Sequence, residues 1–284
     1  MQDYRVKEGM YEHNKNYFIH QLVCYRAIAL SGAAFAAEPE VSLPSLLGDH
    51  TDVTVGVAVL NAPRYMGSKN RQTTALPVLT VQRGPLYFDS TRGIGWQYQS
   101  PSGFYLDHAI GYDLGRDDKN SQWRAGSNRL KGMGKVKGAV TTTVTAGYQF
   151  APWLALEASG EFALSETKRG NQYRVGAKST VWQSVEKDDV LALSADVLMG
   201  DARFNQTYYG VTPQQSLRSG FAAYHAGKGV YGYALGANWT HKFSPAWSTN
   251  VRVTSTWLTD KVADSQVVER RNDTSATLAV LYAF

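Results

Sequence analysis

The sequence has little cysteine and no long apolar run, and each shortage excludes a class of protein. Cys24 is the one cysteine among 284 residues, so neither a disulfide framework nor a cysteine metal site is available. No stretch of eighteen apolar residues occurs, which excludes a transmembrane helix. A β-strand in a membrane barrel needs apolar residues only at every second position, so the modest overall hydropathy leaves that class open.

Charge is also in short supply, at 19% of residues, and the basic excess is only five. Lysine and arginine are scattered along the chain, whereas nucleic-acid binding needs a clustered basic face. We therefore expect no nucleic-acid partner. This small basic excess indicates at most a weak preference for anionic lipopolysaccharide or peptidoglycan.

What the sequence does have is strict alternation, clearest at its carboxyl terminus. One face of an extended strand over 274–284 carries Ala276, Leu278, Val280, Tyr282 and Phe284. The opposite face carries small or weakly polar residues, as expected where one face meets lipid and the other a packed or watery interior. A strand that ends on phenylalanine resembles the closing-strand signal that the barrel assembly machinery of Gram-negative bacteria recognises.

The same period of two recurs along the chain in eleven segments. Short turns expected at 100–103, 151–152, 186–189 and 244–246 alternate with long loops at 115–133, 165–171, 200–228 and 259–273. This rhythm is typical of outer-membrane barrels, with short turns in the periplasm and long loops outside. Aromatic residues gather beside the short turns like an interfacial girdle: Tyr148, Phe150, Trp153, Phe243, Trp247, Tyr282 and Phe284.

We therefore predict an all-β fold, a transmembrane antiparallel up-and-down barrel of about twelve strands. The count is twelve if segment 86–99 is split at Arg92-Gly93, although each half is then short for a spanning strand; ten strands remain an alternative. A soluble β-sandwich or propeller is the other alternative. The expected organisation is a targeting segment over 1–36, a periplasmic lead-in over 37–51 and the barrel over 52–284, located in the outer membrane.

Few residues suggest chemistry. No histidine pair has metal-ligand spacing and no serine stands out as a nucleophile, so we predict no catalytic residue, metal or cofactor. The inward faces instead collect charges of both signs: Glu157, Glu161, Arg174, Lys178, Asp196 and Arg252. They indicate either a narrow water-filled lumen or an interior filled by paired charges, and we favour the narrow or plugged interior.

The long loop over 200–228 contains the most specific pattern in the chain. Its turn formers, side-chain amides and aromatic anchors predict a structured loop that plugs the lumen, binds a ligand or caps the barrel. The candidate interaction residues are Asn205, Tyr208, Tyr209, Gly210, Thr212, Pro213, Gln215 and Ser216.

This loop pattern resembles the signature of the MipA/OmpV family of outer-membrane proteins. The likeness extends to 65–68, 76–79, 111–117 and the terminal 282–284, and covers nearly all of the chain from about Asp52. It implies a scaffold that brings a murein transglycosylase and a murein synthase together in the cell envelope. A narrow channel for small solutes or antibiotics is the alternative, and an outer-membrane enzyme is third.

Overall fold

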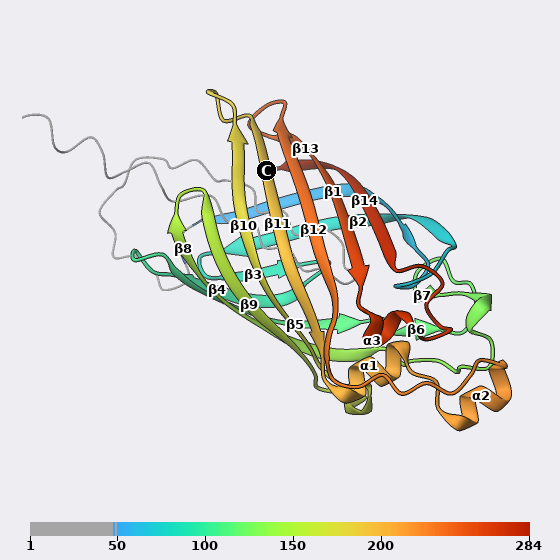
Figure 1. Cartoon of the computed structure of the whole chain (residues 1–284). Coiled ribbons are helices and arrows are strands. Elements are labelled where there is room, and N and C mark those ends of the chain that lie inside the picture. Colours follow the sequence, from blue (N-terminus) through green and yellow to red (C-terminus); the bar gives the residue numbers. More distant parts are fainter. Residues whose placement is uncertain (1–47, 49) are drawn as a thin grey trace, which may run out of the picture.

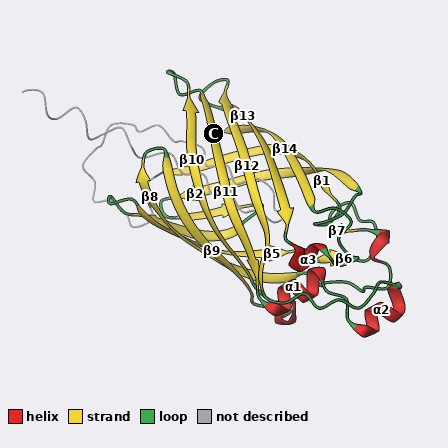
Figure 2. Cartoon of the chain, in the orientation of Figure 1, coloured by secondary structure: helices red, strands yellow, loops and turns green. Residues whose placement is uncertain are grey.

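The computed structural model describes residue 48 and residues 50–284. The expected targeting segment and most of the lead-in therefore lie outside the described residues. Twelve antiparallel strands form a closed barrel, in which the first strand pairs with the last (Figures 1 and 2). The predicted up-and-down barrel and its count of twelve strands are confirmed.

The barrel strands are β1 (Thr51–Pro63), β2 (Arg71–Arg83), β3 (Leu86–Asp89), β4 (Gly93–Gln99), β5 (Phe104–Asp113), β8 (Ala139–Ala151), β9 (Leu154–Ala163), β10 (Gln172–Gln183), β11 (Asp189–Gly200), β12 (Gly229–Lys242), β13 (Trp247–Leu258) and β14 (Asn272–Ala283). The loops carry β6 (Arg116–Asp117), β7 (Ala125–Gly126), η1 (Asn128–Leu130), η2 (Thr167–Arg169), α1 (Ala202–Tyr209), α2 (Pro213–Ser219) and α3 (Asp260–Ala263). None of the helices in the described part of the chain is long and apolar enough to cross a membrane.

The two ends of the barrel differ. Short connections at 84–85, 100–103, 152–153, 184–188 and 243–246 lie at one end, which we call the turn end. Long connections at 64–70, 114–138, 164–171, 201–228 and 259–271 lie at the other, the loop end. Figure 1 shows α1, α2, α3, β6 and β7 gathered at the loop end, where the long connections cover that mouth of the barrel.

Alternate residues along the strands face opposite sides, as the sequence pattern predicts. On β8, Thr141 and Thr143 are buried, whereas Val140 and Val144 are exposed on the outer surface. On β12, Leu235 is 55% exposed and Asn238 only 5%. The outer surface is therefore apolar around the ring, with polar side chains directed inward, the arrangement of a barrel that sits in lipid.

Two details of face and register differ from the expectation. Tyr231 follows the phase of Leu235 in the sequence, yet it is buried at 1% exposure. The register of β11 against β12 shifts between Leu198 and Met199, so this bulge inserts a residue and turns Tyr231 inward. Alternation with Val136 and Gly138 predicts that Lys137 faces inward, but Lys137 lies before β8 begins and its exposed side chain pairs with Glu166 at 3.2 Å.

Candidate functional site

Four of the predicted lumen charges form one buried network across β9, β10 and β11. Arg174 donates to Glu157 Oε1 at 2.5 Å and to Asp196 Oδ1 at 3.2 Å, and Lys178 Nζ donates to Glu157 Oε2 at 2.7 Å. Tyr105 OH, from β5, donates to the same Glu157 Oε2 at 3.0 Å. Pairing register explains the contact, because Gly176 of β10 lies directly between Glu157 and Asp196 and, having no side chain, leaves room for both carboxylates.

The two remaining predicted charges, Arg252 and Glu161, are also buried in the interior. Arg252 is 8% exposed and donates from Nε to Asn238 Oδ1 at 3.3 Å, while its Nη2 has no partner. Glu161 is buried and lines a small cavity of about 10 Å³ together with Arg174 and Tyr231. A volume of that size holds about one water molecule, so this part of the interior is nearly filled.

A second charged cluster joins residues of β3, of β5 and of the connection after β3. Arg92, in the connection between β3 and β4, pairs with Asp107 of β5, and Tyr87 OH donates to both Asp107 oxygens at 3.0 and 3.1 Å. The Arg92 guanidinium also lies over the Tyr87 ring, 4.3 Å from its centroid. The sequence indicates only that Arg92 lies at a break between strands. Its ion pair with Asp107 forms because the hairpin of β4 and β5 brings Asp107 beside it.

The candidate interaction loop forms two short helices and a packed cap. Asp201 caps the start of α1, and Thr212 with Gln215 forms a reciprocal capping box at the start of α2, with Pro213 in its first turn. Gln215 Nε2 also donates to Met133 O at 2.8 Å, which ties α2 to the loop between β5 and β8.

The remaining candidate residues of this loop are anchored in the cap. Asn205 is fully buried and donates from Nδ2 to Gly227 O at 2.8 Å, and Tyr209 OH lies 2.9 Å from Met66 Sδ. Tyr208 OH accepts from Arg169 Nη2. Gly210 N donates to the carbonyls of Asn205 and Gln206 at the end of α1, and Gly220 N donates to Ser216 O at the end of α2. These residues thus hold the loop in shape, and α2 has no buried side chain and presents its outer face to solvent.

Two apolar clusters fill the cap. The first packs Phe204 and Tyr209 of α1 against Tyr231 of β12 and Val262 of α3. The second joins four loops through Tyr65, Leu130, Met133, Val211, Phe221 and Val267. Burial raises the pKa of the Tyr65 and Tyr208 hydroxyls well above their usual range, so both are neutral at physiological pH.

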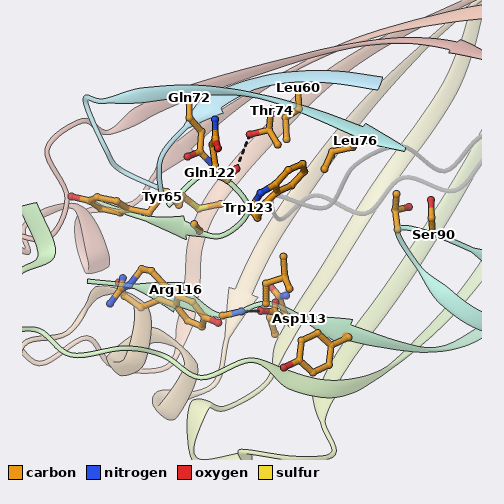
Figure 3. A pocket seen from close by; sticks show the side chains of 18 of the residues that line it. Leu60, Tyr65, Gln72, Thr74, Leu76, Ser90, Asp113, Arg116, Gln122 and Trp123 are labelled. Carbon is orange, nitrogen blue, oxygen red and sulfur yellow. Dashed lines mark hydrogen bonds between the residues drawn. The ribbon is translucent and has the colours of Figure 1, made fainter. Parts of the chain in front are cut away.

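A cavity of about 490 Å³ lies beneath the cap, between β2 and β5 (Figure 3). Its apolar lining includes Leu76, Pro77, Leu114 and Trp123, and its polar lining includes Arg116. Most of these residues were not candidate site residues. Nothing in the sequence indicates that residues 111–117 face Leu76 and Pro77. Among the described residues no cluster of His, Cys, Asp or Glu could hold a metal ion.

A closed barrel with an apolar outer surface, inward polar residues and a capped loop end defines an outer-membrane β-barrel protein. The chain belongs to the family described as MltA-interacting protein MipA, whose model matches residues 55–284. Family and fold together assign it to the outer membrane. No curated protein matches the chain.

Solved structures that resemble the chain include porins and outer-membrane channels. A KdgM porin has 8% identity and a TM-score of 0.38 over 83% of this chain and 99% of its own. OprB of Pseudomonas putida has 8% identity and a TM-score of 0.42 over 83% and 94%. The COG4313 outer-membrane channel of Pseudomonas putida F1 has 11% identity and a TM-score of 0.40 over 86% and 100%.

Proposed function

We propose that this protein is a structural scaffold of the cell envelope, without catalytic activity, that holds a murein-processing enzyme at the inner surface of the outer membrane. The observation that carries the proposal is the interior, where Arg174 and its partners are buried and paired rather than lining open water. An interior braced by buried ion pairs between neighbouring strands suits a rigid anchor better than a conduit. The family description, which names interaction with MltA, supports a murein transglycosylase as the partner.

In this proposal the turn end faces the periplasm and the loop end faces outside, following the usual arrangement of such barrels. The partner surface is then the turn end, where the 184–188 connection is exposed and carries Glu186 and Lys187. A murein synthase recruited to the same complex would also approach from this side.

Site-specific crosslinking tests the proposal. In a Cys24→Ser background, a cysteine-linked photocrosslinker is placed at Glu186→Cys in the turn end or at Gln214→Cys on the exposed face of α2. We expect a crosslink to an MltA-type transglycosylase in cells from position 186 and none from position 214. Crosslinks from 214 alone would overturn the topology, and none from several turn-end positions would overturn the scaffold.

A narrow channel for small solutes or antibiotics is the second candidate, and the presence of both charge signs in the interior favours it. Planar-bilayer conductance separates the two functions. The scaffold predicts no stable unitary current from the purified barrel. Steps of uniform conductance that change in Arg174→Gln would support the channel, because that side chain would then line the ion path.

A further inference from the structure

The wall of the barrel has a notch between β2 and β5 in its loop-end half. The strands between them, β3 and β4, are only four and seven residues long and lie toward the turn end. β2 pairs with β3 only from Thr80 to Arg83, and β5 pairs with β4 only up to Ile110. Where β3 and β4 lie between them, β2 and β5 are three strand spacings of about 4.8 Å apart, or about 14 Å, and beyond that point no barrel strand fills the interval.

The free edge of β2 is identifiable from its hydrogen bonds. The carbonyls of Pro77 and Leu79 accept from Ser90, which lies directly after β3, so this edge of β2 faces the notch and the notch begins beyond Pro77. Because a residue in a strand points its N and O to the same side, the missing N–H of Pro77 also falls on this edge. Proline in a sheet is confined to such edges.

The notch lies at the level of the apolar belt. Pro77 pairs with Val57 and Ala75 with Val59, and these valines are 58% and 42% exposed on the outer surface. On the other side, Tyr112 and Leu114 are 56% and 48% exposed. The notch therefore opens toward lipid acyl chains and not only toward water at the barrel mouth.

The notch leads into the 490 Å³ cavity. Trp123 belongs to the cavity lining and is also 65% exposed, so it stands in the opening (Figure 3). Thr74 Oγ1 of β2 donates to Gln122 O at 3.2 Å, and Arg64 Nη1 donates to Ser121 O at 3.3 Å, so two hydrogen bonds hold the segment that contains Trp123 beside β2. The volume is within the range of small-molecule sites, and the apolar Leu76, Pro77 and Leu114 line the outer part with Trp123.

At the inner part of the cavity lies Arg116, 4% exposed. Its Nη groups donate to the carbonyls of Thr207 and Tyr208 at the end of α1, its Nε has no partner, and among the described residues no carboxylate forms an ion pair with it. Burial lowers the pKa of this guanidinium. A buried cation without an anionic partner is costly, and a carboxylate or phosphate nearby would offset that cost.

We infer that the notch and cavity form a binding site for a single-chain amphiphile with an anionic head, which enters sideways from the membrane. The hydrocarbon chain passes between β2 and β5 beside Trp123, and the carboxylate or phosphate head lies toward Arg116. Asp113 also lines the cavity, where Arg169 pairs with it at 2.9 Å, which leaves Arg116 as the cation available to an anionic head. The site does not depend on the scaffold proposal.

Tryptophan quenching tests the inference. The protein in lipid nanodiscs is titrated with 11-bromoundecanoic acid, whose bromine quenches indole fluorescence on contact. We expect a saturable component, near one equivalent per barrel, that is lost in Trp123→Phe; the other tryptophans give only quenching proportional to the concentration of the probe in the membrane. Quenching without saturation, unchanged in Trp123→Phe, would overturn the site.

Separate arms test the head group and its source. Arg116→Gln should weaken saturable binding at least tenfold, whereas Arg129→Gln, the same change in the cap outside the cavity, should not. Decanoic acid and a lysophosphatidylglycerol should compete with the probe in the native protein, and decanol, which has no charge, should compete at least tenfold less well. This comparison uses only the native protein, so it tests the anionic head even if Arg116→Gln misfolds. Equal competition by decanol would overturn the anionic head, and competition by inorganic phosphate alone would overturn the amphiphile.

Discussion

Leu235→Arg measures which face of β12 meets lipid. Leu235 lies near the middle of the 14-residue strand and is 55% exposed on the outer surface. A guanidinium at the bilayer midplane of a barrel costs about 2 to 4 kcal/mol. We expect a loss of that size in the free energy of unfolding, measured by reversible denaturant titration in phosphatidylcholine bilayers and followed by heat-modifiable migration. His241→Arg, nearer the turn end and beside Asp189 at 2.9 Å, should cost about 0 to 1 kcal/mol.

Asn238→Arg supplies the inward comparison on the same strand. Asn238 is 5% exposed and accepts from Arg252, so the variant brings two guanidinium groups together inside the barrel. That cost is internal and should persist when bilayer is replaced by detergent, whereas the cost of Leu235→Arg should shrink because a micelle admits water more readily. The opposite pattern would mean that the two faces are inverted, since a one-residue slip exchanges every side chain.

Three further outcomes follow from buried contacts. Arg174→Met should lower the free energy of unfolding by about 3 to 5 kcal/mol, because it leaves Glu157 and its neighbours with uncompensated charge; an unchanged denaturation midpoint would contradict the network. Gly147→Ala should cost about 1 to 3 kcal/mol, because a Cβ there would lie 2.1 Å from the Tyr105 ring and force that ring aside; unfolding in denaturant measures it. The cap should loosen in alkali: Tyr208 has its pKa raised by burial, so its contribution is complete below the ordinary tyrosine pKa of about 10 and is lost as the pH rises beyond it. Tyrosinate absorbance and near-ultraviolet circular dichroism should therefore change together at alkaline pH, and normal titration of every tyrosine with an unchanged spectrum would contradict this.

Strand positions and faces could be predicted because a period of two is written directly into the residues. The prediction failed at Tyr231, where a one-residue bulge reverses the phase, and a bulge leaves no mark in an alternating pattern. The halves of segment 86–99 were expected to be short for a span. The sequence does not indicate that two such short strands leave a notch in the barrel wall beside β2.

Helices α1 and α2 were not predicted within the 200–228 loop. At eight and seven residues they are too short to be stable on amphipathic pattern alone, and their stability comes from end caps and tertiary contacts. Thr212, Pro213 and Gln215 do carry a capping-box signal, which would have located α2. The cavity was beyond sequence reasoning, because Arg116, Trp123 and Leu76 come together only through barrel closure.

The cap also determines how the ring is completed. β1, the first strand of the barrel, pairs with β14, the last, and this pairing is the seam that closes the ring. Two hydrogen bonds in the cap cross the seam: Tyr65 OH donates to Val267 O at 2.9 Å, and Glu269 N donates to Gly67 O at 2.7 Å. These contacts cross the seam, so we expect the cap to form after the first and last strands have paired. Once formed, it must come apart before the seam can part, which makes the escape of the first or last strand slow and gives the barrel a kinetic resistance to unfolding.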